Sequence, residues 1–423
     1  MTLIYNATFD KNTRKLSFED KAGNEIYSFT VPERTPAVDD ITKPLTFKAT
    51  QDGSTVALDR PGYPSGDFQT SRDGGNTWED YTIGTDITIN TGEEVSFRAK
   101  SDRTSAQYYN HYFSFKMTGK IEAWHNVMSL YRTNDFATYN TVVSCAFGRL
   151  FDRCTSLTKA PALPATTLAY YCYASMFSGC QSLTKAPALP ATTLATECYS
   201  YMFSGCQSLT KAPELPATTL AKRCYECMFE SCQSLTKAPE LPATTLAEIC
   251  YSSMFRDCQS LTKAPELPAT TLADYCYASM FCGCQSLTKA PELPATTLTR
   301  DCYKYMFESC RSLTKAPELP ATTLTINCYQ SMFESCQSLT KAPVLPATTL
   351  TQNCYYCMFQ ICQSLKEVRI SATTKAQDAL YNWLSRVSET GDFYCNPNAT
   401  IFPAGKSGIP SGWRRLNIND YPN

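Results

Sequence analysis

The apolar positions in the central part of the chain recur with a strict period of 26 residues. From Cys154 to Ile361, eight consecutive units follow the pattern C-x-S-L-T-K-A-P-x-L-P-A-T-T-L-x-x-x-C-Y-x-x-M-F-x-x. A ninth unit begins at Cys362 and then departs from the pattern. A period of 20–50 residues indicates a solenoid, in which each turn of the chain packs on its neighbours. The repeats therefore predict an elongated stack over residues 154–372, not a globule around a pocket.

One segment of each unit carries apolar side chains every four residues. Cys172, Met176 and Cys180 lie at i, i+4 and i+8, and Tyr173 and Phe177 follow the first two. Apolar residues at this spacing share one face of a helix. The pattern therefore predicts a short amphipathic helix with one buried stripe in every unit.

The rest of each unit has the features of an extended segment. Thr184–Leu189 is expected to be extended, but Pro187 and Pro190 limit its ladder hydrogen bonds because proline has no amide hydrogen. A helix and an extended segment in every unit predict a mixed α/β leucine-rich-repeat solenoid of about eight 26-residue turns with caps.

The chain before the repeats shows the period-two alternation of β-strands bounded by turns. Residues 1–40 predict a small β-element, and residues 41–118 predict a sandwich-like all-β module. We expect these modules to attach the chain to an assembly partner on a virion or a cell surface. The predicted strands are Leu3–Phe9, Arg14–Phe18, Glu25–Val31, Leu45–Ala49, Thr55–Leu58, Asp67–Ser71, Asp86–Ile89, Val95–Ala99 and Tyr112–Met117.

Degenerate segments flank the repeats, as expected of caps that close the core to water. Residues 119–153 form the predicted N-terminal cap, in which Phe151 stands where later units have the Phe of Met-Phe. Residues 373–423 form the predicted C-terminal cap. A helix is expected at Thr374–Val387, because apolar residues fall at i, i+3, i+4 and i+7 from Leu380.

The repeat frame C-x-S-L-T…P…L…C-Y-x-x-M-F-x-x-C-x-S-L resembles the BspA-like, Treponema-type bacterial leucine-rich repeats. The usual core of that family is A-F-x-x-C-x-x-L-x-x-I-x-I-P, and this chain has Met-Phe in place of Ala-Phe. The tail around Ser407–Trp413 is similar to those of proteins from gut Bacteroidales and their phages. The resemblance implies adhesion or ligand recognition and carries over no catalytic residues.

Most of the 22 cysteines form two ladders with the 26-residue period. Each ladder occupies a position where the repeat needs a small buried apolar group, a role that free cysteine fills well. Buried reduced thiols are the favoured interpretation, over disulfides between turns or metal binding. The remaining Cys227, Cys282 and Cys357 fall at variable positions and are expected to be exposed. The ladders are Cys172, Cys198, Cys224, Cys250, Cys276, Cys302, Cys328 and Cys354, and Cys154, Cys180, Cys206, Cys232, Cys258, Cys284, Cys310, Cys336 and Cys362.

Composition gives no support for several function classes. A formal net charge of −1 argues against nucleic acid as the partner. No apolar run approaches the length of a membrane span, and no signal peptide is visible at the N-terminus. The chain has two histidines and no recognised catalytic or nucleotide-binding motif, so no enzyme, cofactor or metal is expected. Ser71–Trp78 matches the Asp-box of sialidases, but a single copy is interpreted as a hairpin turn.

Two faces of the predicted solenoid are candidates for ligand binding. The first is the strand face, where lysine and glutamate recur in parallel rows, about 5 Å apart from coil to coil. Adjacent rows of opposite charge either neutralise one another or offer donors and acceptors to a glycan or an extended peptide. The candidate residues are Lys185, Lys211, Glu214, Lys237, Glu240, Lys263, Glu266, Lys289, Glu292, Lys315 and Glu318.

The second candidate is the variable face, formed by positions that differ between otherwise copied units. Such variation indicates either drift at exposed sites without a packing role or a diversified recognition surface. Tyrosine suits recognition because it offers much contact area at little entropic cost. The candidate residues are Tyr170, Tyr171, Tyr201, Lys222, Arg223, Tyr275, Arg300, Tyr305 and Tyr356.

The sequence therefore predicts a non-enzymatic adhesion or recognition protein for a cell-surface glycan or protein. A phage tail or virion appendage, made in the host cytoplasm and binding a host receptor, is slightly favoured. A bacterial cell-surface adhesin and a purely structural spacer are the alternatives.

Overall fold

The structure is a computed structural model that describes residues 6–10, 15–22, 24–30, 39–59, 67–102 and 113–421. The chain divides into two compact units, Met1–Asp40 and Ile41–Asn423. In the first unit, β1 (Asn6–Asp10), β2 (Lys15–Glu19) and β3 (Glu25–Thr30) form an antiparallel sheet in the order β1-β2-β3. The ends of the predicted strands at residues 3–5, 14 and 31 lie outside the described residues.

The second unit begins with two β-sheets that share an aromatic core. The ring of Phe47 lies 4.6 Å from that of Phe115 and 5.6 Å from that of Phe97. Strands lie where the alternation predicts them, and β7 and β11 are two that the sequence analysis missed. The strands are β4 (Leu45–Ala49), β5 (Ser54–Asp59), β6 (Phe68–Ser71), β7 (Glu79–Tyr81), β8 (Ile87–Ile89), β9 (Glu94–Ala99), β10 (Ser114–Thr118) and β11 (Ile121–Trp124).

The larger of these two sheets continues into the repeats. Its order is β12-β11-β4-β9-β6-β7, and β12 (Leu157–Lys159) belongs to the first repeat unit. β11 pairs with β12 in parallel, with Ile121 opposite Leu157. The rings of Phe115 and Phe151 stack at 5.4 Å across this junction. The β-strands before the repeats therefore cover the first coil and extend the same hydrophobic core.

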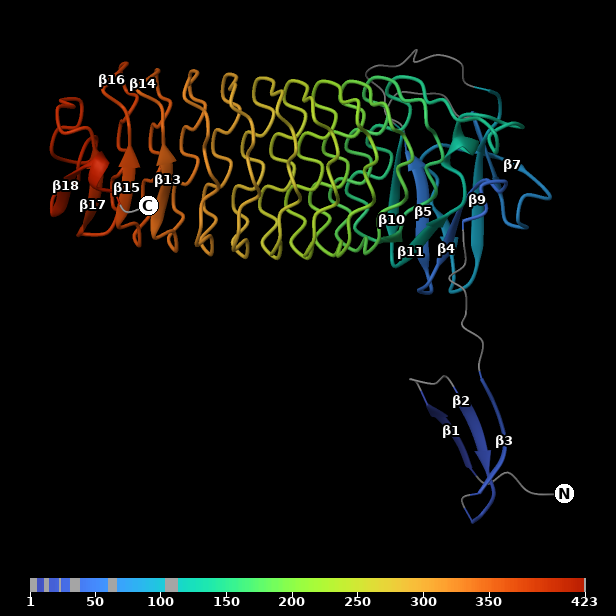
Figure 1. Ribbon diagram of the computed structural model, residues 1–423. Helices are drawn as coiled ribbons and strands as arrows, with labels where there is room; N and C mark the ends of the chain where they lie inside the picture. The colour runs from blue at the N-terminus through green and yellow to red at the C-terminus, as the bar shows by residue number, and fades with distance from the viewer. Residues whose placement is uncertain are drawn as a thin grey trace. The chain divides into compact units, whose positions relative to one another are not determined.

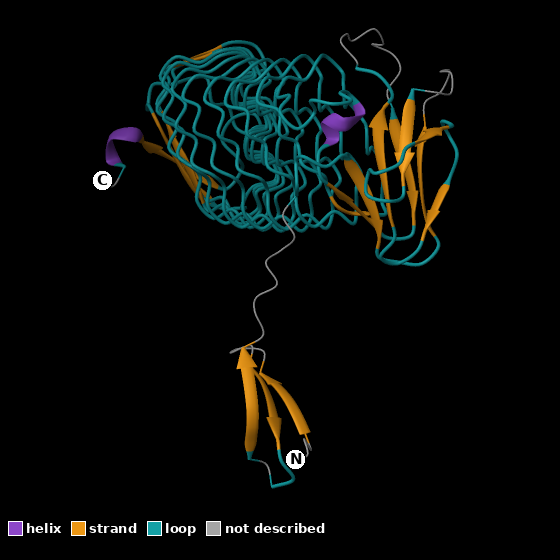
Figure 2. Ribbon diagram, turned by 90° about the vertical axis from the view of Figure 1, so that its right-hand side faces the viewer, coloured by secondary structure: helices purple, strands orange, loops and turns teal. Residues whose placement is uncertain are grey.

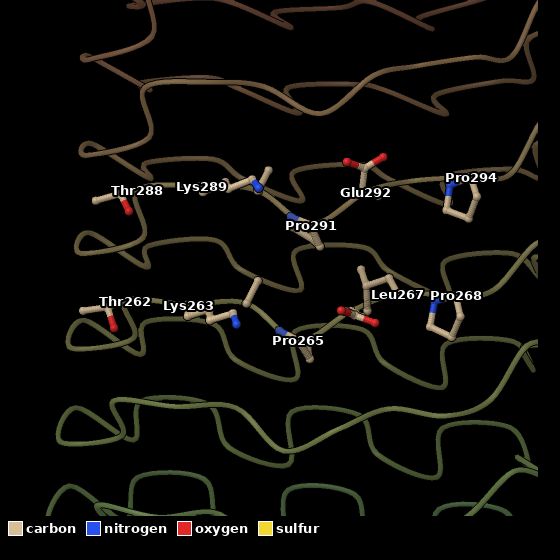
Figure 3. Close-up of a pocket in the computed structure, with 13 residues that line it drawn as sticks. Thr262, Lys263, Pro265, Leu267, Pro268, Thr288, Lys289, Pro291, Glu292 and Pro294 are labelled. Atoms are coloured by element: carbon tan, nitrogen blue, oxygen red, sulfur yellow. The ribbon is translucent and has the colours of Figure 1, made fainter.

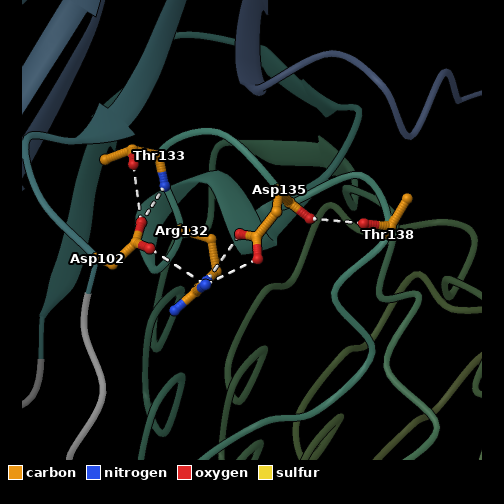
Figure 4. A network of polar contacts seen from close by, with 5 residues as sticks. All are labelled: Asp102, Arg132, Thr133, Asp135 and Thr138. Atoms are coloured by element: carbon orange, nitrogen blue, oxygen red, sulfur yellow. Dashed lines mark hydrogen bonds and ion pairs between the residues drawn. The ribbon is translucent and has the colours of Figure 1, made fainter.

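A polar clamp near the junction links the residues after β9 to the loop after η1 (Val127–Leu130). Arg132 donates two hydrogen bonds to Asp135, at 2.8 and 2.7 Å, and forms an ion pair with Asp102 at 3.1 Å (Figure 4). Asp102 also accepts hydrogen bonds from the backbone amide and hydroxyl of Thr133. These bonds lower the pKa of Asp102 below its usual range, with the Thr133 amide as the largest cause.

From residue 154 onward, each unit makes one coil about a common axis, and the coils stack side by side (Figure 1). The view turned by 90° shows the coils as superimposed closed outlines (Figure 2). The apolar positions of every coil lie in the interior and form one continuous core with the β-module. A solenoid of stacked coils, predicted from the period, is therefore confirmed.

The predicted mixed α/β fold is wrong, because the segments expected to be helical are chains of tight turns. No α-helix is present in the part of the chain that the structure describes; its helical elements are the short 3-10 segments η1 and η2 (Ile418–Asp420). In the segment from residue 172 to 180, alternate amides bond to the carbonyl three residues earlier, as in Met176 N to Tyr173 O at 3.2 Å. The amides between them bond to the next coil, as in Phe177 N to Met202 O at 2.9 Å.

Hydrogen bonding between coils explains this outcome. An α-helix uses its amides within the segment, in bonds four residues long. In the observed turns, half of the amides donate hydrogen bonds to carbonyls of the neighbouring coil instead, so every segment is bonded to the stack. A strict four-residue repeat also keeps Cys172, Met176 and Cys180 in line, whereas a period of 3.6 residues would rotate them away from the core.

The turn segments place a left-handed residue at every fourth position. In one coil these residues are Tyr171, Ser175 and Gly179, with φ values of 56°, 54° and 71°. Glycine adopts this conformation freely, and Asn and Asp tolerate it better than other residues do. Gly, Ser, Asn and Asp recur at these positions, although other coils have Tyr, Arg or Ile there.

Two columns of stacked aromatic rings run through the core. Phenylalanines from Phe151 to Phe359 stack at 5.3–5.8 Å between ring centroids, with interplanar angles of 8° or less. Tyrosines from Tyr173 to Tyr355 form a second column at 5.7–6.0 Å. Trp383 closes both columns, with its ring 6.4 Å from Tyr355 and 6.4 Å from Phe359. A stacked pair contributes about 0.5–1.5 kcal/mol beyond its buried area, so the columns stabilise adjacent coils.

The cysteine ladders are buried, as predicted, and all 22 cysteines are free thiols. In the ladder from Cys154 to Cys362, each thiol donates to a phenylalanine carbonyl. The acceptor for Cys154 is Phe115 of β10, and the later acceptors lie in earlier units, as in Cys180 Sγ to Phe151 O at 3.1 Å. Cysteine therefore combines a small apolar volume with a weak donor. The prediction that Cys227, Cys282 and Cys357 are exposed is wrong: they are 6–7 % exposed, and Cys282 Sγ lies 3.5 Å from the carboxylate of Glu308 on the next coil.

The C-terminal cap continues the coils without the predicted helix. At Thr374–Val387, β16 (Thr374–Lys375) is followed by turns in which Asp378 and Asn382 have positive φ. The same four-residue turn pattern explains this error. A four-stranded parallel sheet, β13-β15-β17-β18, closes the stack (Figure 1). Its strands are β13 (Lys341–Leu345), β15 (Glu367–Ile370), β17 (Gly391–Cys395) and β18 (Trp413–Asn417), and β14 (Thr349–Leu350) pairs separately with β16.

Candidate functional site

The strand face presents its two rows of charged side chains to solvent. Every predicted residue of this face, in the lysine row from Lys185 to Lys315 and in the glutamate row from Glu214 to Glu318, is exposed. Among the described residues, no ion pair joins these two rows to each other or to another group. The rows therefore do not neutralise one another by direct contact, and their charges remain available to a ligand.

Three hollows lie between successive coils on this face. The largest has a volume of about 730 Å³, and two others of about 340 and 510 Å³ repeat the same lining one and two coils earlier. In the largest, Lys263 and Lys289 flank the hollow on one side, and the prolines form its walls (Figure 3). Volumes of 300–1,000 Å³ are typical of ligand sites. The lining includes the predicted Lys211, Glu214, Lys237, Glu240, Lys263, Glu266, Lys289 and Glu292.

The prolines of the K-A-P-x-L-P segment explain why the hollows are there. Successive prolines leave the coils joined by isolated bridges, such as Lys237 to Lys263, in place of a continuous ladder. Where the neighbouring coil lacks proline, the ladder forms: β13 pairs with β15 through Lys341 and Glu367, although the register shifts at Pro343. The sequence therefore opens the strand face over the repeats and closes it at the C-terminal end.

The C-terminal tail contacts the strand face at its C-terminal end, and the sequence analysis did not predict this contact. The Tyr421 hydroxyl donates to Glu367 at 2.6 Å. The Tyr421 ring centroid lies 4.9 Å from Nζ of Lys341 and 4.5 Å from Cζ of Arg369. The ring of Tyr394 packs edge-on against Tyr421 at 4.8 Å.

The charged candidates of the variable face are already paired within the chain. Lys222 forms an ion pair with Glu248 at 2.8 Å, and Arg300 pairs with the fully buried Asp301 at 3.1 Å. Arg223 lies 3.5 Å from Glu226. These cations stabilise neighbouring turns and are less available to a ligand than the strand-face lysines.

Several tyrosines of the variable face have a conformational role in addition to any contact they make. Tyr171, Tyr201, Tyr275 and Tyr305, together with Arg223, adopt positive φ at the left-handed turn positions. The inference that variable positions have no structural role is therefore incomplete, because the backbone limits which residues fit there.

The remaining variable-face tyrosines fall into separate groups. Tyr170, which is 43 % exposed, has its ring 5.8 Å from that of Tyr171. At the other end of the stack, the Tyr356 ring stacks at 4.9 Å on Tyr381, a residue that the sequence analysis missed. The predicted Tyr170 and Tyr171 are in contact at one end of the stack, Tyr356 contacts Tyr381 at the other, and Tyr275 belongs to a coil between them.

Comparison with known proteins identifies the repeats. Residues 148–287 and 248–385 match the family described as BspA type leucine rich repeat region, in six copies. Together these matches span more than half of the chain. The chain belongs to this family of leucine-rich-repeat proteins. Comparison with curated proteins and with solved structures gives no significant match.

In this BspA-type repeat protein, burial keeps the ladder cysteines in the thiol form. Burial raises the pKa of the Cys172 and Cys206 thiols to about 12, so the thiolate needed for nucleophilic attack does not form near neutral pH. Among the described residues, no cluster of three or more His, Cys, Asp or Glu side chains is arranged to hold a metal ion. No described helix has the length and apolar composition of a membrane span.

The Asp-box of this leucine-rich-repeat protein forms a structural turn. Asp73 accepts hydrogen bonds from the amides of Asn76 and Thr77 at 3.0 Å and from the Thr77 hydroxyl at 2.6 Å. These bonds, with the Thr77 hydroxyl as the largest cause, lower the pKa of Asp73 well below its usual range. The Trp78 indole donates to Gly75 O at 2.9 Å, and Arg98 lies over its ring. The Asp73 carboxylate therefore accepts hydrogen bonds that stabilise the turn.

Proposed function

We propose that this protein is a non-enzymatic recognition protein whose strand face binds a cell-surface glycan or protein. The observation that carries the proposal is the row of hollows between coils, flanked by exposed and unpaired lysine and glutamate side chains. Membership of a family of repeat proteins that act through interaction supports a binding role. A flat array of equivalent sites favours avidity, because a ligand that repeats can occupy several coils at once.

The proposed setting is a phage tail or another virion appendage that binds a host receptor, with the N-terminal β-strands as the attachment region. Free thiols at all 22 cysteines support synthesis in a reducing compartment such as the host cytoplasm. A bacterial cell-surface adhesin would use the same strand face, and genomic neighbours encoding tail or outer-membrane proteins distinguish the two settings.

The test is a binding screen of the full-length chain against a glycan array, candidate surface proteins and whole bacterial cells, followed by charge reversal of the strand face. The triple variant Lys237→Glu, Lys263→Glu, Lys289→Glu is expected to weaken binding by about ten-fold or more, because opposite charge steers and holds the ligand. Unchanged binding by this variant contradicts the proposal.

A matched control changes the variable face. Tyr170→Ala and Tyr201→Ala remove two exposed rings there, and the proposal expects binding to remain as in the wild type. Loss of binding in these variants alone would move the site to the variable face. A chain that binds nothing in the screen while remaining folded by circular dichroism would support the structural spacer.

A further inference from the structure

The C-terminal tail of this chain binds at one end of its own strand face. Lys341 belongs to the same row as Lys185 and Lys315 in the repeats, at the position where the tail lies. At the last coils, the Tyr421 ring lies against Lys341, whose side chain remains 57 % exposed and pairs with Glu367, whereas the equivalent lysines from Lys185 to Lys315 have no ion pair among the described residues. This contact shows one kind of group that the end of the lysine row accepts.

The contacts of Tyr421 use two properties of a tyrosine side chain. Its ring lies close to the cations of Lys341 and Arg369, at distances typical of cation–π attraction. Its hydroxyl donates a charge-assisted hydrogen bond to the carboxylate of Glu367. Hydrogen bonding to Glu367 and to Tyr421 raises the pKa of Lys341, so its ammonium group stays charged beside the Tyr421 ring.

The open hollows also offer lysine and glutamate, but there the two lie on one coil, whereas at the closed end Glu367 lies opposite Lys341 on the next coil and Arg369 adds a second cation. Lys263 and Glu266 stand three residues apart on an extended segment, a distance of about 10 Å. A tyrosine spans such a gap when its ring lies on the ammonium and its hydroxyl points to the carboxylate. The walls between them are Pro265 and Pro291, which are apolar and lack amide hydrogens to compete for the hydroxyl (Figure 3).

The lining residues also indicate which partner supplies the aromatic ring. None of the residues that line the three described hollows is aromatic. The hollows have no aromatic side chain on which a sugar ring could stack, whereas a peptide ligand can itself supply an aromatic ring. The tail that occupies the closed end is itself a short peptide segment after β18.

We infer that the strand face of the repeats binds peptide segments that carry tyrosine, and that Tyr421 occupies one such position within the chain. This inference rests on the proposed function and assigns its ligand class: a tyrosine-bearing segment of a protein partner. Each bound tyrosine places its ring on a lysine of the row and its hydroxyl toward a glutamate. Equivalent coils allow a segment with several tyrosines to bind more tightly than one with a single tyrosine.

The experiment uses the full-length chain and a synthetic peptide of residues 416–423, Leu-Asn-Ile-Asn-Asp-Tyr-Pro-Asn, with a fluorescent label. Fluorescence anisotropy is expected to show saturable binding. The same peptide with alanine in place of tyrosine should bind about ten-fold more weakly or worse, because ring and hydroxyl are both lost. Phenylalanine in that place should have an intermediate effect, because it keeps the ring alone.

Variants of the chain locate the bound peptide. The double variant Lys263→Ala, Lys289→Ala should weaken binding several-fold, and Lys222→Ala, a paired lysine on the variable face, should leave it unchanged. Tyr421→Ala should free the position that Tyr421 occupies and raise the number of peptides bound per chain. Thermal unfolding of each variant confirms that its fold is intact.

Two outcomes overturn the inference: no saturable binding at millimolar peptide, or equal binding of the tyrosine and alanine peptides. A glycan that binds in the screen and is lost on strand-face charge reversal would then leave the proposed function standing. Peptide binding that survives every strand-face variant overturns both the inference and the proposed site.

Discussion

At the scale of single residues, the left-handed positions decide which side chains the repeat tolerates. Gly179, Gly205 and Gly283 occupy one of these columns, and Asn327 and Asn353 occupy another. The same columns also hold Ile249 and Ile361, with φ values of 61° and 64°. A β-branched side chain in this conformation crowds the backbone, so these two isoleucines store strain that their equivalents avoid.

We expect Ile249→Asn to stabilise the protein by about 1 kcal/mol, because asparagine adopts the left-handed conformation more readily than isoleucine does. Its equivalents Asn327 and Asn353 show that the side chain fits this column. The measurement is the midpoint of thermal or denaturant unfolding.

The matched control is Ile326→Asn, which makes the same chemical change at a 44 % exposed position outside the positive-φ columns. It should leave the midpoint unchanged. A lower midpoint for Ile249→Asn, or an equal rise in both variants, would contradict the strain argument.

At the scale of elements, the coil is a set of columns rather than a helix packed on a strand. Thiols, phenylalanines and tyrosines each form a column, and burial raises the pKa of the thiols and of the core tyrosines, such as Tyr199. The Tyr173, Tyr251 and Tyr303 hydroxyls are buried without a hydrogen-bond partner, which costs free energy that the stacked rings offset. The columns therefore favour one protonation state, with every thiol and phenol neutral.

This burial predicts alkaline destabilisation. Unfolded thiols ionise near their ordinary pKa of 9.0, whereas Cys172, Cys206 and Cys224 in the folded chain keep their protons until about pH 12. Between these values the unfolded state binds fewer protons than the folded state, so the free energy of unfolding falls as pH rises. Below pH 9 the stabilising contribution is fully present.

The measurement is the denaturant midpoint at pH 7, 8, 9 and 10 with a phosphine reductant present throughout. We expect a plateau up to about pH 8 and a steady fall above pH 9. A midpoint at pH 10 equal to that at pH 7 would show that the thiols ionise without unfolding.

At the scale of the whole molecule, the stack is close to one-dimensional. Each coil bonds mainly to its two neighbours, the β-strands before the repeats cover one end, and the β13-β15-β17-β18 sheet with Trp383 covers the other. Stability in such a protein is approximately a sum of coil and neighbour terms. Its length is therefore adjustable in whole coils, but not in fractions of a coil.

Deletion of residues 206–231, which form one complete unit, should give a folded chain. The new neighbours have equivalent side chains at every column, so register and stacking are kept. We expect a wild-type circular dichroism spectrum and a modest loss of thermal stability.

Deletion of residues 206–218, half of the same unit, is the control. It sets the strand face of one coil against the turn segment of the next and should give an aggregated or unfolded chain. Equal behaviour of the two deletions would show that the coils do not depend on their neighbours.

The sequence alone determined the repeat, the burial of the cysteine ladders, the family and the exposure of the strand-face rows, because each depends on periodicity and side-chain type. It did not determine the path of the backbone at Cys172–Cys180, since apolar residues four positions apart are also typical of one face of a helix. Only hydrogen bonds to the next coil decided between them. Burial of Cys227 and the seating of Tyr421 on Lys341 and Glu367 likewise depend on neighbours far away in the chain, which a local pattern does not contain.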